Sequence, residues 1–197
     1  MRDGRIGMKA TRDPLSEPCR RDRPGVTVPR RAALALLAIP AAIPAAAQEP
    51  TARAAGRDLV LNGTGVRRFL GFEVFRAWLY LEAPSRDGAA IIASPGVKLV
   101  RSRYLRDVPL SRLEPEWERG FAEHCRCAMP PAFRARLRDL RSGETETWLF
   151  TADGADVAYG GERPVRLPPR EATAMLAGLI GPDADSAGLR RGLLGLG

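Results

Sequence analysis

The sequence predicts an α+β domain, in which helices cover one face of an open, largely antiparallel sheet. The order of elements is strands first, helices in the middle, a hairpin, and then helices again, which is typical of this class. The longest strand candidate, 72–81, is apolar on both alternating faces except at Arg76, so it should be a central strand covered on both sides. Asn-Gly at 62–63 and Asp-Gly at 153–154 are turn signals that join neighbouring antiparallel strands.

The first half of the domain is predicted to consist mainly of strands. Gly63 and Gly65 indicate a turn between two short strands, and Pro95-Gly96 interrupts the chain after a helix. The strand that follows carries alternating positive charges. The expected elements are strands at 58–62, 64–70 and 72–81, a helix at 85–93, and a strand at 97–104.

The second half begins with a helix from Ser111 to about Cys125. Ser111 with Glu114 fits a capping box, and Leu113, Trp117 and Phe121 recur at helical spacing. The remaining expected elements are a helix at 133–140, strands at 144–151 and 155–159, and helices at 168–179 and 184–194.

The positive charge of the chain is concentrated at its start. The whole chain has 31 Lys and Arg against 23 Asp and Glu, a net charge of +8. Residues 1–47 hold nine of these basic and four of these acidic residues, which leaves 22 and 19 for the rest. Since the remaining charges are interspersed, we expect no nucleic-acid partner.

Residues 1–47 are predicted to be an export signal. Arg30 and Arg31 precede an apolar run at 32–47 that ends in three alanines, a pattern of signal cleavage. The run contains two prolines and is too short to cross a bilayer, so no stable membrane span is expected after its removal. A lipid-retained anchor and a disordered tail remain alternatives, and either export route fits.

This organisation places the mature protein in the periplasm or otherwise outside the cytoplasm. Residues 48–57 are predicted to be a linker, and 58–197 a single domain. Cys125 and Cys127 form a Cys-x-Cys next to the only histidine, His124. Side chains two apart on a helix do not face each other, so two separate thiols are favoured over a bridge. We expect no metal site and no cofactor.

Four segments of the domain resemble the bacterial chalcone isomerase-like family when they are taken in order. They are Leu-Asn-Gly-Thr-Gly-Val-Arg at 61–67, Ala-Trp-Leu-Tyr-Leu-Glu at 77–82, Tyr-Leu-Arg-Asp-Val at 104–108, and Leu-Ile-Gly-Pro with Arg-Arg-Gly-Leu-Leu-Gly between 179 and 195. The resemblance covers nearly all of 58–196. It implies an open sheet with a layer of helices and a ligand cleft between the two.

The resemblance also bears on activity. Plant enzymes of this family cyclise chalcones with an arginine that corresponds to Arg67, and with a tyrosine and an asparagine. The matching segment here, 108–125, contains neither, and 74–76 has no hydroxyl where those enzymes use a threonine. Because each lost donor removes about 2.7 to 4 kcal/mol of oxyanion stabilisation, we expect binding without catalysis.

The predicted ligand is a small apolar molecule or carboxylate, with a fatty acid as the first candidate, because non-enzymatic relatives bind fatty acids. Two alternatives remain: an intramolecular lyase of chalcone isomerase type, and a structural or interaction protein whose cleft is filled by Trp117 and Phe121. The predicted ligand-binding residues are Arg67, Tyr104, Trp117, Phe121 and Thr173.

Overall fold

Residues 49–197 are described by the computed structural model, and the predicted export signal lies outside them. Within this part of the chain, no helix is long and apolar enough to cross a membrane. The predicted linker at 48–57 contributes a strand of its own, β1 (Thr51–Ala54), which pairs with the next strand along the chain. The ordered domain therefore starts earlier than position 58.

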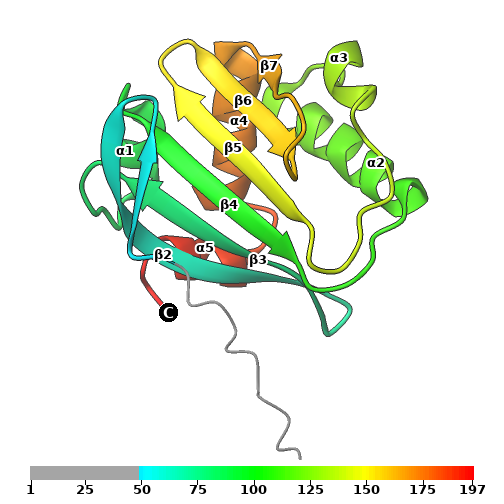
Figure 1. Cartoon of the computed structure of the whole chain (residues 1–197), viewed down its shortest axis with the longest axis horizontal. Helices are drawn as coiled ribbons and strands as arrows, with labels where there is room; N and C mark the ends of the chain where they lie inside the picture. Colours follow the sequence, from blue (N-terminus) through cyan, green and yellow to red (C-terminus); the bar gives the residue numbers. More distant parts are fainter. Residues whose placement is uncertain (1–48) are drawn as a thin grey trace, which may run out of the picture. The chain divides into compact units, whose positions relative to one another are not determined.

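A seven-stranded antiparallel sheet forms the body of the domain (Figure 1). Each strand pairs with the next along the chain, so the sheet is a simple antiparallel meander, which agrees with the predicted antiparallel sheet. After β1 the strands are β2 (Arg57–Phe69), β3 (Phe72–Leu81), β4 (Lys98–Tyr104), β5 (Thr145–Thr151), β6 (Gly154–Tyr159) and β7 (Val165–Leu167).

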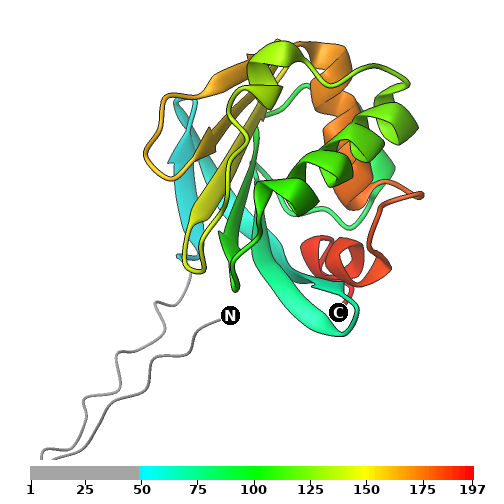
Figure 2. The ribbon, with the colours of Figure 1, turned by 90° about the vertical axis from the view of Figure 1, so that its right-hand side faces the viewer.

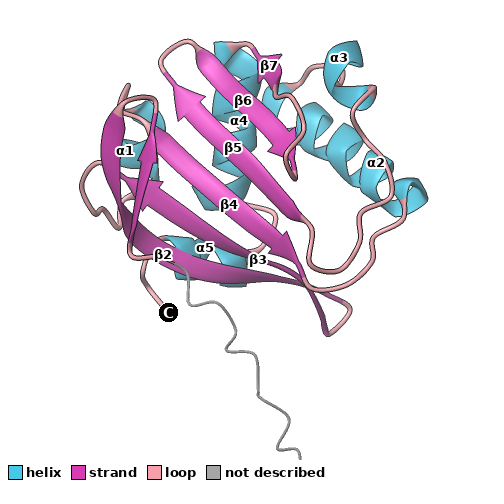
Figure 3. Cartoon of the chain, viewed as in Figure 1, coloured by secondary structure: helices cyan, strands magenta, loops and turns pink. Residues whose placement is uncertain are grey.

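The helices lie together on one side of this sheet, as expected. Figure 2 shows α2, α4 and α5 on the same side, and Figure 3 shows the strands in front of them. The helices are α1 (Gly88–Ala93), α2 (Leu110–Gly120), the π-helical turn η1 (Phe121–Cys125), α3 (Pro131–Arg134), α4 (Pro169–Ile180) and α5 (Ala187–Leu193).

The second half of β3, from Ala77 to Leu81, is largely buried on both faces, as its apolar pattern predicted, whereas the first half is exposed or only partly buried. Ala77 and Leu79 face the helices and belong to the main core. Tyr80 faces the other way and packs with Leu59 and Leu99 in a second, smaller core. The helix-covered face of the sheet is therefore the place where a buried site can form.

Gly63 and Gly65 do not form a turn, because β2 runs through them as one continuous strand. A Cβ at Gly63 would lie 2.2 Å from the carbonyl oxygen of Gly192, and one at Gly65 would lie 2.4 Å from that of Leu189. The glycines therefore allow the backbone of α5 to pack directly onto β2. The two glycines are therefore required by the fold, but for close helix packing and not for a turn.

Asn62 also has a different role from the predicted turn. A register shift between β2 and β3 lies at this residue. Its amide donates to the Leu193 carbonyl at 2.8 Å, and its side-chain oxygen accepts from the Ser85 amide at 2.7 Å. Asn62 thus joins β2 both to the end of α5 and to the segment before α1.

The middle helix begins one residue earlier than predicted and has no capping box. Pro109 occupies the N-cap, and no side chain caps it locally. The Leu110 amide instead donates to the carboxylate of Asp139 at 2.8 Å, so the cap comes from a distant segment. The helix predicted at 133–140 is shorter and lies earlier, as α3 at Pro131–Arg134. The short strand β7 was not predicted.

Cys125 and Cys127 form a disulfide, with Cα atoms 5.1 Å apart, which corrects the prediction of two separate thiols. That prediction assumed a continuing helix. The chain instead leaves η1 at Arg126, which has a left-handed backbone with φ of 52°. This turn brings the two flanking side chains together.

Candidate functional site

Arg67 lies on the helix-covered side of β2, where the resemblance placed it. Its Nη1 donates to the backbone carbonyl of Asp185 at 2.6 Å, and its Nη2 lies 3.9 Å from the carboxylate of Glu116. Only 19% of the side chain is exposed. The arginine therefore already has a polar and an acidic partner within the chain, so a ligand carboxylate at Arg67 would compete with Glu116.

Arg68, the next residue, points to a different environment. A register shift separates the two arginines, and Arg68 pairs with Glu73 at 2.6 Å near the exposed end of the hairpin. Of the pair, Arg67 contacts the helical side of the sheet and Arg68 does not.

Two further ionisable side chains lie close to Asp185. His124 contacts the Asp185 carboxylate at 2.8 Å, and Glu123 completes a group whose ligand atoms lie within 4.8 Å of one another. The His124 ring also lies against α4, where only Gly178 leaves room for it: a Cβ there would come within 2.9 Å of Cδ2. These contacts join β2, η1 and the loop before α5 around Arg67.

The two predicted aromatic walls belong to a packed cluster. The ring of Trp117 lies 5.3 Å from those of Phe133 and Trp148, and Phe121 lies 5.5 Å from Phe133. Phe121 and Phe133 are fully buried. These rings fill the space between α2, η1 and α3 on one side and β5 on the other.

Tyr104 belongs to a buried polar cluster beside these rings. Its hydroxyl donates to the carboxyl of Glu146 at 3.1 Å, and Glu146 lies directly across from Tyr159 on the neighbouring strand. All three side chains are buried. Among the described residues, Glu146 Oε1, the Tyr159 hydroxyl and Trp117 Nε1 have no hydrogen-bond partner. Sequence patterning missed Glu146 because it occupies a regular inward position of β5.

Burial controls the protonation of this cluster. Loss of water raises the pKa of Glu146, which favours the neutral acid. Burial, followed by the nearby Glu146 charge, also raises the pKa values of Tyr104 and Tyr159 well above the usual range for tyrosine. A neutral carboxyl that two phenols face is consistent with a packed interior.

Thr173 is not part of either group. It lies on the exposed part of α4 and lines a hollow with Lys98 and Phe150. Lys98 begins β4 and Tyr104 ends it, so the hollow and Tyr104 are about 20 Å apart along the sheet. The structure thus groups Arg67, Trp117 and Phe121 near one end and places Thr173 at the other.

The hollow at Thr173 has a volume of about 220 Å³ and lies between α1 and the first turns of α4. Lys98, which is 5% exposed, sits among its lining residues and donates to the carbonyl oxygens of Ser94 and, at 2.9 Å, Gly96. Its burial lowers its pKa, an effect that the charge of Glu82 opposes. The apolar wall consists of Ile92, Phe150, Pro169, Ala172 and Leu176, with smaller residues between them.

A second hollow of about 320 Å³ lies on the other side of Lys98. Glu82 lines it, accepts from the Val97 amide at 3.0 Å and lies 3.5 Å from Arg57. Because this hollow already contains a carboxylate, it is a poor place for a second anion. Within residues 49–197, no acidic residue lines the hollow at Thr173.

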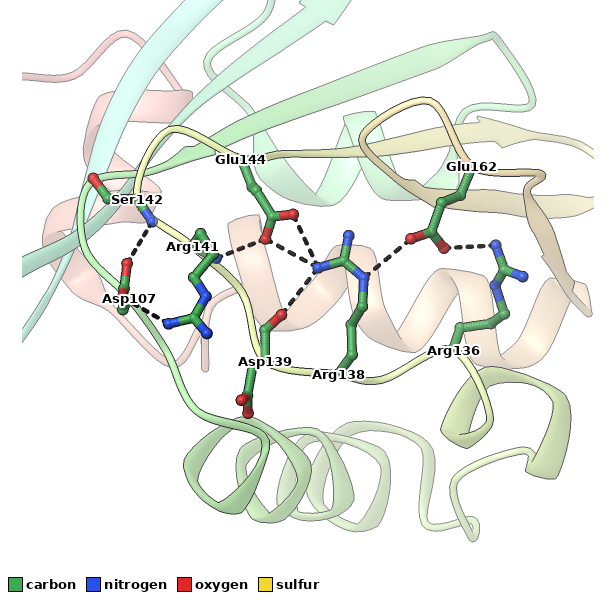
Figure 4. Close-up of polar contacts among 8 residues, drawn as sticks. All are labelled: Asp107, Arg136, Arg138, Asp139, Arg141, Ser142, Glu144 and Glu162. Atoms are coloured by element: carbon green, nitrogen blue, oxygen red, sulfur yellow. Dashed lines mark hydrogen bonds and ion pairs between the residues drawn. The ribbon is translucent and has the colours of Figure 1, made fainter.

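Another charged cluster, which Figure 4 shows, holds surface segments together. Arg138 bridges Glu144 and Glu162, both at 3.0 Å, and Arg141 pairs with Asp107 at 3.1 Å. Hydrogen bonds from Arg138 lower the pKa of Glu144. The pKa of Asp107 is lowered mainly by the hydrogen bond from the Ser142 amide and, to a smaller extent, by the one from Arg141. Since these acids and bases satisfy one another, the cluster has a structural role.

A sequence profile described as chalcone isomerase-like matches residues 42–195. The chain belongs to the chalcone isomerase-like family. Its fold is similar to the crystal structure of an Arabidopsis thaliana fatty-acid binding protein, with a TM-score of 0.55 and 10% sequence identity. The alignment covers 73% of this chain and 95% of that one. No curated protein sequence matches the chain significantly.

Within this chalcone isomerase-like protein, sequence reasoning missed the residue that combines charge, burial and a neighbouring hollow. In the sequence, Lys98 is one of several alternating positive charges on its strand. A lysine at an inward position of a strand, directly after a helix and a Pro-Gly break, was the available signal. Whether such a lysine borders a hollow depends on α1 and α4, which lie far from each other in the sequence.

Proposed function

We propose that this protein binds a small amphiphilic carboxylate, such as a short- or medium-chain fatty acid, without transforming it. The binding site is the hollow between α1 and α4, with the carboxylate at Lys98. The fold similarity to a fatty-acid binding protein supports this class of ligand. The position of the site rests on the geometry of this chain alone.

The observation that carries the proposal is the buried ammonium group of Lys98 in a hollow whose lining, among the described residues, contains no acidic side chain. An ammonium has three donors, and two of them are used by the Ser94 and Gly96 carbonyls. The third is available to an anion. Within the described residues Lys98 makes no direct salt bridge, and only the nearby charge of Glu82 opposes the burial that lowers its pKa. A bound carboxylate would add a direct charge partner and so offset more of that burial.

The remaining lining suits the rest of such a ligand. The Thr173 hydroxyl makes no side-chain hydrogen bond within the described residues, so it can donate to the second carboxylate oxygen. Ile92, Phe150 and Leu176 offer apolar contacts to an alkyl chain. A volume of about 220 Å³ is smaller than ordinary ligand pockets, which favours a short or medium chain.

Binding is favoured over catalysis at this place because the hollow lacks a pair of groups for proton transfer. Lys98 is the only ionisable residue among the described residues that line it. An acid–base reaction needs a positioned proton donor or acceptor with a suitable pKa next to the reacting atoms. The Lys98 ammonium instead donates hydrogen bonds to two backbone carbonyls. The proposal therefore contains no chemical step.

The same proposal includes export. The basic, apolar and small-residue order of 1–47 supports cleavage near Ala47 and a periplasmic or otherwise exported mature protein. N-terminal sequencing of the protein recovered from the cell envelope is the test. A mature chain that begins at or near Gln48 is expected, and an intact leader in the mature pool contradicts export.

Calorimetric titration with octanoate, and with octanol as a neutral control, tests the binding proposal. We expect Lys98→Met to weaken octanoate at least tenfold and octanol little, because methionine keeps the apolar volume without the charge. Arg67→Ala should leave octanoate binding unchanged. Loss of binding in Arg67→Ala but not in Lys98→Met would move the carboxylate to the arginine. An unmodified protein that binds neither ligand refutes the proposal.

A further inference from the structure

The tip of the β2–β3 hairpin exposes three large apolar side chains. Phe69 is 50% exposed, Leu70 80% and Phe72 61%. Leu105, at the adjacent end of β4, is 37% exposed, and its amide donates to the Val74 carbonyl at 2.9 Å. Figure 1 shows that the hairpin extends beyond the ends of the neighbouring strands. Contiguous exposed apolar groups of this kind mark interaction sites.

The turn at this tip uses a residue that backbone preference disfavours. Leu70 and Gly71 both have positive φ, 48° and 82°, as in the two-residue turns that prefer Asn-Gly. A leucine in the left-handed region is uncommon and costs conformational energy. Asparagine would fit the same backbone with a polar side chain. The chain thus holds a disfavoured leucine at the point of greatest exposure.

Three arginines lie on β3, on β4 and just after β4, and one of them contacts the tip. Arg76 and Arg103 lie directly opposite each other on neighbouring strands, although like charges in this position repel. Arg106 stacks over the Phe72 ring at 4.7 Å. Within the described residues none of the three makes a salt bridge. They therefore form a group of free cations next to the exposed apolar side chains.

From this arrangement we propose that the hairpin tip docks on an anionic lipid surface. Phe69, Leu70 and Phe72 enter the boundary between headgroups and acyl chains, and the three arginines contact lipid phosphates. This pairing of apolar insertion with basic attraction is the physical basis of peripheral membrane binding. A second copy of the chain fits the tip poorly, since it would bring two groups of unpaired arginines together.

The proposal does not depend on the ligand hollow, because the two lie at opposite ends of β3. The hairpin tip adjoins Phe72, whereas the hollows adjoin Leu81, which pairs with Lys98. Membrane docking and carboxylate binding can therefore succeed or fail separately in experiment.

Vesicle co-sedimentation of the full chain tests membrane docking. The probes are vesicles of phosphatidylcholine alone and of phosphatidylcholine with about one third phosphatidylglycerol. The tip variant Phe69→Thr, Leu70→Asn, Phe72→Thr keeps strand-forming residues and a turn-compatible asparagine, so it should fold. Leu196→Ser is the matched control, because Leu196 is 45% exposed but lies outside the tip. All of these proteins carry the same residues 1–47, so a difference in vesicle binding between them reports on the substituted residues.

We expect the unmodified chain and Leu196→Ser to bind the anionic vesicles alike, and the tip variant to bind at least tenfold more weakly. Arg76→Gln and Arg103→Gln should each weaken binding about fivefold and reduce its dependence on the anionic lipid. Equal binding by the tip variant and the unmodified chain overturns the proposal. The proposal is also overturned if the unmodified chain self-associates in sedimentation without vesicles and the tip variant does not.

Discussion

The backbone carbonyl of Asp185 accepts a hydrogen bond from Arg67 at 2.6 Å. The same residue contacts His124 through its carboxylate. Asp185 therefore connects β2, η1 and the loop between α4 and α5. Arg67 is thus engaged by the chain itself, and a structural role for it follows directly from these contacts.

Replacing Arg67 should destabilise the fold more than replacing its neighbour. Arg67→Ala removes a charged hydrogen bond to a carbonyl and is expected to lower the free energy of unfolding by about 1 to 3 kcal/mol. Arg68→Ala breaks an exposed pair with Glu73 and should cost less than about 1 kcal/mol. Urea unfolding of both variants measures the difference. Equal losses would show that the Asp185 contact contributes nothing special.

The contact between β2 and α5 gives a second prediction. A Cβ at Gly192 would lie 2.3 Å from the Thr64 carbonyl oxygen, whereas Gly188 on the same helix has nothing within 4 Å. Gly192→Ala should therefore lower the free energy of unfolding by about 1 to 3 kcal/mol through overpacking. Gly188→Ala should be neutral or stabilising by up to about 1 kcal/mol. Thermal unfolding of the two variants tests this, and a stable Gly192→Ala would contradict the close approach.

These glycines also show how far the sequence determines the fold. The α+β class, the antiparallel sheet and the central position of 72–81 follow from local patterns and were predicted, but β1 and β7 were not, and β2 was predicted as two strands. The purpose of Gly63 and Gly65 did not follow, because it depends on a helix more than a hundred residues later. The disulfide was missed for a related reason, since a single left-handed residue, Arg126, ends the helix.

The buried carboxyl of Glu146 predicts a characteristic pH dependence. Because its pKa is raised in the folded state, its contribution to stability is present below about pH 4.3 and is lost as the pH rises through the raised pKa. The loss should approach about 1.4 kcal/mol per pH unit within that window. Glu146→Gln should lack this component.

Denaturant unfolding of the two proteins across the acidic to neutral range isolates the effect. Asp107 and Glu144 have lowered pKa values and act in the opposite direction, but they are common to both proteins and cancel in the difference. Parallel pH profiles would show that Glu146 titrates normally and is not desolvated as its burial indicates.

Reduction of the disulfide should have a small effect on stability. The bridge closes a loop of only three residues, and the restriction of such a short loop is worth about 1.5 kcal/mol in the chain-entropy account. Cys125→Ser with Cys127→Ser should therefore remain folded and lose no more than about this amount. Near-ultraviolet circular dichroism and urea unfolding check it, and a variant that fails to fold would give the bridge a larger role.

The candidate site was less predictable than the fold. Family resemblance directed attention to Arg67, and helical spacing singled out Trp117 and Phe121, which the structure packs into one aromatic cluster. Lys98 and Thr173 come from different elements, and only the tertiary packing of α1 against α4 places them around one hollow. A local sequence pattern does not show that Lys98 and Thr173 lie close together in the fold.

The most direct measurement of the central proposal is a crystal structure of the protein with octanoate. The account predicts the carboxylate within hydrogen-bonding distance of Lys98 Nζ and the Thr173 hydroxyl, with the alkyl chain against Phe150 and Leu176. Octanoate bound beside Arg67, or a hollow between α1 and α4 that stays free of octanoate at saturating concentration, would contradict it.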